Sequence, residues 1–212
     1  MGLSIKKNQE GFTIIEMLIA TAVLSTILVL ITVMMVNIGS LYYKGINQSK
    51  IQGATRSVTD EVSQQLQALD TTYRTATPLT AGGQTYQAYC IGTTRYVYVL
   101  DVGIGSTQQH VLWRDDNGGG ACTAINLNVA TPSAGGVELM PPSSRLTVFS
   151  ITSATPGVSP YSITVGTAYT SEGKDDSLTG VGLGVDTKCK GDRDRQYCST
   201  AYLKTFVAKR LN

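Results

Sequence analysis

The chain has 212 residues, of which 42% are hydrophobic and only 15% are charged. An average soluble domain is about a quarter charged, so the composition is not that of a standard cytosolic protein. The net charge of +2 disfavours a strongly basic nucleic-acid binder. The length allows one domain, or one domain with an appendage, and the apolar fraction excludes low-complexity disorder.

The N-terminal part of the chain is strongly apolar. A short polar segment with Lys6 and Lys7 precedes the run from Met17 to Ile38, which exceeds the ~20 apolar residues needed to cross ~30 Å of hydrocarbon. A cleaved secretory signal has an apolar core of roughly 7 to 15 residues and a small-residue cleavage site, and this run differs in both respects. We therefore predict a membrane-spanning segment that stays in the mature protein. The two lysines place the N-terminus in the cytoplasm and everything after Lys44 outside.

Glu16 is the only charged residue between Phe12 and Tyr43. A carboxylate near the start of a membrane helix costs about 1 to 3 kcal/mol, depending on its depth. One interpretation places Glu16 in the headgroup layer, where the positive end of the helix dipole favours it. The residues around it favour a more specific interpretation.

The string KKNQEGFTIIE, residues 6–16, resembles the N-terminal signal of type IV pilins and type II secretion pseudopilins. In both there is a short basic leader, then Gly11, Phe12, three further residues, Glu16 and a long apolar helix. The resemblance implies that a membrane prepilin peptidase cuts between Gly11 and Phe12 and that the new Phe12 amine is methylated. It also implies that the helices of many subunits form a filament core, in which Glu16 pairs with the Phe12 amine of a neighbouring subunit.

The apolar spacing after the membrane segment predicts that the helix continues. Residues Ile51, Ala54, Val58, Val62, Leu66 and Leu69 recur every three or four positions, which is the spacing of a straight helix that packs on the protein's own sheet. Since no proline precedes Pro78, we predict a helix from Phe12 to about Asp70. The weak points in it are Gly39, Gly45 and Gly53.

Beyond Asp70, short apolar runs alternate with turn residues. This pattern predicts one antiparallel sheet, from about Tyr86 to the end, wrapped on the exposed half of the helix. Turns are expected at Thr77–Gly83, Arg114–Gly120, Thr131–Gly136 and Ser153–Pro160. Five or six strands are expected, among them Thr94–Leu100, Gln109–Trp113, Ser144–Thr152, Tyr161–Tyr169 and Ala201–Ala208.

The predicted fold class is therefore α+β and pilin-like: a long N-terminal helix packed against a C-terminal antiparallel sheet. We expect four parts. Residues 1–11 are a leader removed on processing, and residues 12–43 are the transmembrane and filament-core half of the helix. Residues 44–70 are its amphipathic half, and residues 71–212 are a β-rich globular domain.

The four cysteines all follow the membrane segment, on the oxidising side of the predicted topology. Three pairings are possible. We favour Cys90 with Cys122 and Cys189 with Cys198, because each pair brackets a loop between predicted strands, and each bond would contribute about 2 to 4 kcal/mol. A C-terminal disulfide-bounded loop also resembles pilins. Zinc is disfavoured, since there is no CxxC and His110 is the single histidine.

The sequence lacks the motifs that mark serine catalysis and phosphate binding. The chain has neither GxSxG nor GxxxxGK[ST], so we predict no enzymatic activity, no cofactor and no metal. The aspartates 175, 176, 192 and 194 would offer oxygens to calcium, but neither stretch has the D-x-D-x-D-G loop.

Two groups of basic residues bear on nucleic-acid binding. Lys188, Lys190, Arg193 and Arg195 are interleaved with Asp186, Asp192 and Asp194, and Lys204, Lys209 and Arg210 form a second weak patch. Because the charges of the first group nearly cancel, a solvated loop is favoured over a nucleic-acid site.

The sequence thus predicts a structural subunit, a minor pilin or a pseudopilin, of a type IV pilus or a type II secretion-like filament. Before assembly it would be a single-pass protein of the inner membrane, and afterwards part of a periplasmic or extracellular filament. Its expected partners are prepilin peptidase, other pilin subunits and membrane lipid. The alternative is a single-pass anchor whose β domain binds an extracellular ligand, including DNA in an uptake system, without polymerising.

Overall fold

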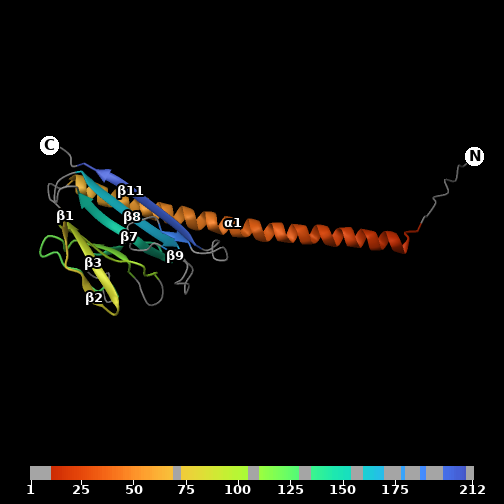
Figure 1. Cartoon of the computed structure of the whole chain (residues 1–212), viewed down its shortest axis with the longest axis horizontal. Coiled ribbons are helices and arrows are strands. Elements are labelled where there is room, and N and C mark those ends of the chain that lie inside the picture. The colour runs from red at the N-terminus through yellow and green to blue at the C-terminus, as the bar shows by residue number, and fades with distance from the viewer. Residues whose placement is uncertain are drawn as a thin grey trace, which may run out of the picture. The chain divides into compact units, whose positions relative to one another are not determined.

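The computed structural model describes residues 11–68, 73–104, 110–128, 135–153, 160–169, 178–179, 187–189 and 198–208. Within these ranges there are one helix and eleven strands (Figure 1). The chain divides into two compact units, residues 1–42 and residues 43–212, and each is described by itself.

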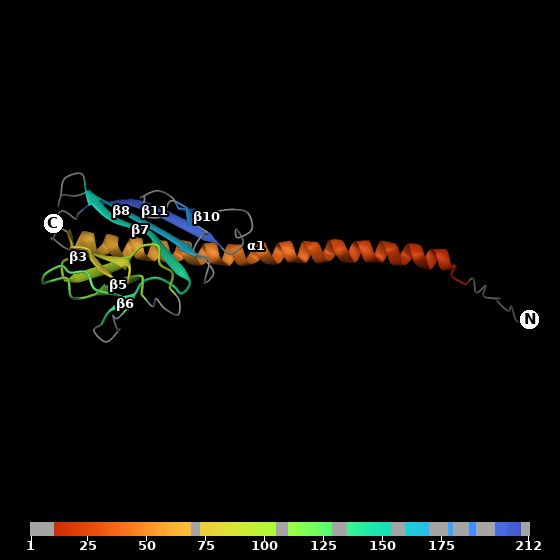
Figure 2. The same ribbon diagram turned by 60° about the horizontal axis from the view of Figure 1, so that its bottom comes forward.

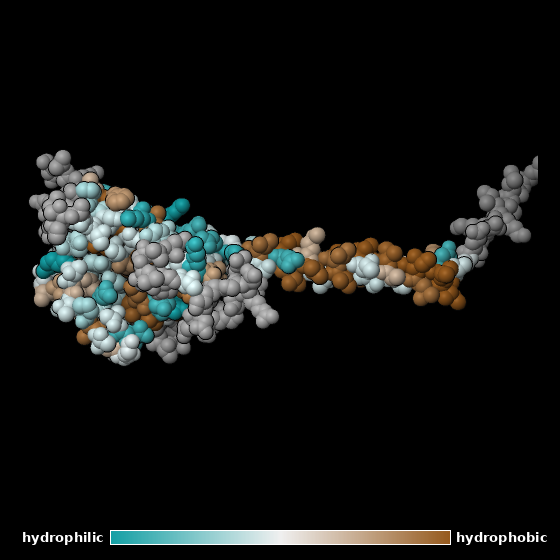
Figure 3. Space-filling model, in the orientation of Figure 1, coloured by the Kyte–Doolittle hydropathy of each residue, from teal (hydrophilic) through white to brown (hydrophobic). Residues whose placement is uncertain are grey.

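Helix α1 runs from Ile14 to Ala68 without a break. It begins two residues after the predicted start, and Asp70 and Leu69 lie outside the described residues. Every side chain from 14 to 38 is exposed, and Figure 3 shows apolar side chains covering this part of the helix. The uninterrupted helix follows from the absence of proline, since glycine alone costs only about 1 kcal/mol per position.

The second half of α1 buries one face within the unit of residues 43–212. The predicted stripe is confirmed at Ile51, Val58, Val62 and Leu66, all of which are buried. Ala54 is only partly buried, and Thr55 is buried instead. Its hydroxyl lies 2.8 Å from the Ile51 carbonyl and 2.6 Å from the Thr167 hydroxyl, so a polar group enters the core because both of its partners are there.

The strands form three antiparallel sheets rather than the single sheet predicted. The largest has six strands in the order β1-β3-β4-β5-β6, with β2 paired to β3. Their bounds are Tyr73–Thr75 for β1, Leu79–Ala81 for β2, Gln84–Ile91 for β3, Thr94–Val99 for β4, Leu112–Asp115 for β5 and Val137–Glu138 for β6. The second sheet has the order β11-β8-β7, with bounds Ser199–Val207, Tyr161–Tyr169 and Ser144–Ser153. The third pairs β9, Leu178–Thr179, with β10, Lys188–Cys189.

The chain passes from the first sheet to the second in the connection between β6 and β7. This connection contains Pro141 and Pro142, and a proline cannot donate a hydrogen bond to a sheet ladder. The chain therefore leaves the first sheet after Glu138 and starts a new sheet at Ser144. Helix α1 bonds to both sheets, through Thr55 to β8 and through Glu61 to Arg114 of β5. Figure 2 shows the second half of the helix running beside strands of both sheets.

Four of the predicted strands are confirmed to within about two residues, as β4, β7, β8 and β11. The strand predicted at Gln109–Trp113 starts later, at Leu112, and Gln109 lies outside the described residues. The turn predicted at Thr77–Gly83 was too long, because it contains β2 and turns only at Gly82 and Gly83, whose φ angles are 59° and 78°. The turn predicted at Arg114–Gly120 begins two residues later, after β5, and the other two predicted turns lie mostly outside the described residues.

The core contains an aromatic cluster between the two larger sheets. The rings of Tyr89 and Tyr98 are stacked, with centroids 5.6 Å apart. Phe149 of β7 meets both edge-to-face, at 5.6 Å and 5.0 Å. Such pairs contribute about 0.5 to 1.5 kcal/mol beyond their buried area, so this cluster joins β3 and β4 of one sheet to β7 of the other.

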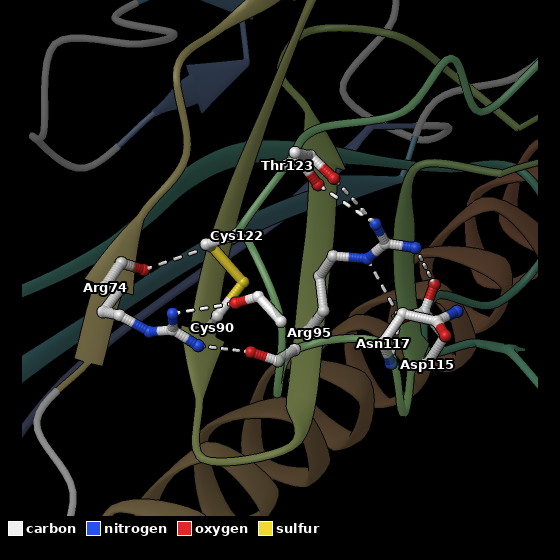
Figure 4. The surroundings of a disulfide bond; sticks show 9 residues. Arg74, Cys90, Arg95, Asp115, Asn117, Cys122 and Thr123 are labelled. Atoms are coloured by element: carbon white, nitrogen blue, oxygen red, sulfur yellow. Dashed lines mark hydrogen bonds and ion pairs between the residues drawn. A yellow bond between two sulfur atoms is a disulfide. The ribbon is translucent and has the colours of Figure 1, made fainter.

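Two disulfide bonds are present, joining Cys90 to Cys122 and Cys189 to Cys198. These are the pairs favoured from the sequence. The first bond ties β3 to the segment that follows β5 (Figure 4). No free cysteine remains in the chain, so the disulfides are structural crosslinks of the β-rich unit.

Arginine side chains hold the glycine-rich segment beside the first disulfide. Arg74 donates to the carbonyl of Gly120 at 2.9 Å and to that of Gly118 (Figure 4). The backbone of Gly118 lies so close to β4 that an added Cβ would be 2.5 Å from the Thr94 carbonyl oxygen. Only glycine fits there, which explains one member of the Gly118–Gly120 run.

Candidate functional site

The candidate processing site lies immediately before α1. Gly11, Phe12 and Thr13 precede the first helical residue and are exposed. No atom lies within 4 Å of a Cβ placed on Gly11, and the Phe12 side chain is 84% exposed. None of the described residues therefore covers the peptide bond between Gly11 and Phe12, and another protein can reach it.

Thr13 and Glu16 form a reciprocal cap at the start of the helix. The Thr13 amide donates to Glu16 Oε2 at 2.8 Å, and the Thr13 hydroxyl donates to the same oxygen at 2.7 Å. In return the Glu16 amide donates to Thr13 Oγ1 at 3.3 Å. This is a capping box, with Thr13 as the N-cap and Glu16 three residues on. It stabilises the first turn by about 0.5 to 2 kcal/mol and fixes where the carboxylate lies.

An apolar groove adjoins the cap. Phe12, Met17, Ala20, Thr21 and Leu24 line it, with a volume of about 240 Å³. Phe12 precedes the N-cap and Met17 is the fourth helical residue, which are the two positions of a hydrophobic staple. Both side chains are largely exposed, and the amide bond between Gly11 and Phe12 is open as well.

The apolar part of α1 is suited to a dry environment. α1 is the one helix in the described part of the chain that is long and apolar enough to cross a membrane. The four hydroxyls between Met17 and Ile38 each donate to a carbonyl of the same helix at 2.8 to 3.0 Å, from Thr21, Ser25, Thr26 and Thr32. Because these donors are satisfied inside the helix, they do not require water.

The structure therefore brings Gly11, Phe12 and Glu16 together at one end of the helix, as the sequence predicted. The four cysteines are elsewhere, in the β-rich unit. Sequence reasoning missed Thr13, although T-x-x-E before an apolar run is a readable capping signal. Within the described residues no group of three or more His, Cys, Asp or Glu side chains could hold a metal ion.

The other candidate residues lie mainly outside the described part of the chain. This holds for the possible calcium ligands Asp175, Asp176, Asp192 and Asp194. It also holds for most of the basic patches: Lys190, Arg193, Arg195, Lys209 and Arg210.

A second feature missed from the sequence is the carboxylate of Glu138. It accepts hydrogen bonds from the backbone amides of Val111, Leu112 and Met140 at 2.9 to 3.0 Å. His110 Nδ1 lies 3.5 Å from it. Burial raises the pKa of Glu138 to about 7, against the opposing effect of the backbone amides. The side chain satisfies two backbone donors at the start of β5, so we assign it a structural role.

An exposed apolar helix of membrane-spanning length therefore begins with a capped first turn directly after a Gly-Phe pair. Comparison with protein families agrees: residues 6–32 match the prokaryotic N-terminal methylation motif. This motif is the signal of type IV pilins and pseudopilins, and the chain carries it. No curated protein and no solved structure matches the chain.

Proposed function

We propose that the chain is a minor pilin or pseudopilin, which is processed at Gly11–Phe12 and assembled into a filament through α1. The methylation motif supports a pilin-like substrate of prepilin peptidase and favours a structural subunit. The observation that carries the proposal is the capped start of α1, where an open Gly-Phe bond precedes an exposed apolar helix whose sole charged residue before Lys44 is Glu16.

The first step is removal of the leader, residues 1–11. Glycine before the cut has no side chain to obstruct a protease that approaches the backbone at the membrane face. Cleavage removes Lys6, Lys7 and Glu10 and creates a cationic amine at Phe12. Methylation then modifies that amine. The helix cap is unaffected, because Thr13 and Glu16 both stay in the mature chain.

The second step is assembly. The apolar side chains of residues 12–43, which are exposed in the single chain, leave lipid and pack against those of other subunits. A buried carboxylate must be paired or neutralised. In this proposal Glu16 pairs with the Phe12 amine of a neighbouring subunit, and residues 71–212 remain outside the apolar core. The helix and the signal fit anchoring in the inner membrane before this step.

Mass spectrometry of the protein from its native membranes tests the proposal. The expected mature chain begins at a methylated Phe12. A chain that keeps Met1 or Gly2 would contradict processing, and would leave the single-pass anchor with a ligand-binding β domain as the better interpretation. A bulky substitution, Gly11→Leu, should accumulate uncut precursor, whereas Gly11→Ala should be cut at a measurable rate.

A further inference from the structure

We propose that Tyr42, Tyr43 and Lys44 anchor α1 in the outer phospholipid headgroup layer before assembly. The anchor sets the depth of the helix and thereby the height at which the Gly11–Phe12 bond is presented on the opposite side. The partner is the lipid interface itself. This inference rests on the proposed function, because it requires that the chain be inserted in a membrane.

The length of the helix fits this placement at both ends. The 22 residues from Met17 to Ile38 rise about 33 Å along α1, and a tilt of about 20° reduces this to the thickness of the hydrocarbon. Glu16 and Lys44 are separated by about 42 Å along the helix, which is about 40 Å across the membrane at the same tilt. The bilayer with its headgroup layers is about 40 to 45 Å thick, so both charged residues reach an interface at the same time.

The polarity of the helix changes at the expected point. Up to Ile38 the hydroxyls are satisfied by helix carbonyls, and Asn37, Gly39 and Ser40 then begin a more polar stretch. After one further apolar residue, Leu41, come the two tyrosines and the lysine. A tyrosine ring is amphipathic and is enriched at membrane interfaces, and a lysine there extends its ammonium group toward the headgroups. Anionic lipids attract such a cation.

The protein's own fold leaves these side chains at the surface. Tyr42 is 66% exposed and Tyr43 is 62% exposed. Consecutive residues of a helix point about 100° apart, so the two rings cover a broad part of its circumference. Two rings that point in different directions contact a medium around the helix more readily than they contact one flat partner surface. This favours lipid as the partner.

The depth of the helix can be measured in the full chain. All four native cysteines are in disulfide bonds, so one introduced cysteine is the single site for a membrane-impermeant maleimide. Asn37→Cys, Ser40→Cys, Gly45→Cys and Ser49→Cys would be labelled in vesicles of phosphatidylcholine with phosphatidylglycerol. We expect protection at 37 and labelling at 45 and 49.

The anchor predicts how this profile responds to substitution. In Tyr42→Ala/Tyr43→Ala the boundary between protected and labelled positions should shift by about one turn, seen as a several-fold change in labelling at position 40. The variant Tyr42→Trp/Tyr43→Trp should restore the native boundary. An unchanged boundary in the double alanine variant would overturn the anchor. Lys44→Gln should shift this boundary in vesicles that contain phosphatidylglycerol and leave it unchanged in vesicles of pure phosphatidylcholine. Equal behaviour in both kinds of vesicle would show that Lys44 is not part of the anchor.

Two further outcomes separate the anchor from the proposed function. If position 37 of the otherwise native chain is labelled as fast as position 49, the chain is not inserted, and membrane anchoring fails together with the anchor. If the double alanine variant shifts the boundary but prepilin peptidase cleaves it at the native rate, the coupling between anchor and processing is wrong. We expect cleavage to slow several-fold, and Tyr42→Trp/Tyr43→Trp to restore it.

Discussion

Thr13 and Glu16 bond to each other in both directions across the first turn of α1, and both bonds from Thr13 end on the same carboxylate oxygen. A carboxylate has about four acceptor positions. The amine of a neighbouring subunit can therefore bind Glu16 without breaking the cap. The capping box presents the carboxylate in a fixed position, so it lowers the conformational entropy lost when the intersubunit pair forms.

Replacing Thr13 tests the contribution of the cap. Thr13→Ala removes the hydroxyl that bonds Glu16 and should destabilise the first turn by about 1 kcal/mol. We expect faster amide hydrogen exchange at residues 14–17 in micelles and a several-fold loss of incorporation into filaments, with cleavage retained. Thr13→Ser keeps the hydroxyl and should behave as the native chain. Equal exchange and assembly in both variants would show that the cap has no role.

Substitutions of Glu16 separate the cap from the intersubunit ion pair. Glutamine also serves as the third residue of a capping box, so Glu16→Gln should keep the first turn but lose the charge. We expect both Glu16→Gln and Glu16→Ala to be inserted and cleaved but absent from sheared filaments. If the glutamine variant assembled normally, the proposed pair with the Phe12 amine would be wrong.

Gly118 and Gly119 provide a matched pair in the β-rich unit. A Cβ on Gly118 would lie 2.5 Å from the Thr94 carbonyl oxygen, whereas one on Gly119 would lie 3.5 Å from the Thr93 methyl group. We expect Gly118→Ala to lower the free energy of unfolding by about 1 to 3 kcal/mol through overpacking. Gly119→Ala should change it by less than about 0.5 kcal/mol. Urea titrations of both variants make the comparison, and similar midpoints would contradict it.

Glu138 should give the stability of the β-rich unit an unusual pH dependence. Its folded-state pKa of about 7 lies above the ordinary value of 4.5, so between these values the folded chain binds more protons than the unfolded chain. The free energy of unfolding should therefore fall as the pH rises from about 4.5 to 7, by at most about 1.4 kcal/mol per pH unit.

The variant Glu138→Gln should flatten this profile, because the amide does not titrate. His110 lies 3.5 Å from Glu138, so His110→Gln is the control for its contribution. Urea titrations at several pH values measure the slope. A native protein that becomes more stable between pH 4.5 and 7 would refute the assignment.

Features of the fold that depend on neighbouring residues could be predicted from the sequence, and features that depend on distant residues could not. The stripe of α1 at Ile51, Val58 and Val62 and the strand β8 follow from periodicity in the nearby sequence. The buried position of Thr55 depends on Thr167, which is far away in the chain, and the division into separate sheets depends on where Pro141 and Pro142 redirect it. Such long-range pairings leave no periodic signal, so they could not be predicted.

The same distinction applies to the candidate site. Gly11, Phe12 and Glu16 lie within six consecutive residues, and a motif of this length can be read directly. The role of Glu138 could not be read, because its partners Val111 and Leu112 are more than 25 residues earlier in the chain, at the start of β5. Nothing in the local sequence distinguishes it from a solvated glutamate.

The stoichiometry of the filament is the last prediction. Major pilins commonly carry a helix-breaking proline in the apolar half of the helix, but this chain has none before Pro78 and its helix is continuous to Ala68. The glycine-rich segment 118–120 is held by Arg74 in the chain's own fold, which leaves it less adaptable for dense lateral packing. We therefore expect the subunit to form a small fraction of purified filaments, measured by quantitative mass spectrometry against the other subunits. If it made up most of the filament mass, the minor role would be wrong, while processing at Phe12 would be unaffected.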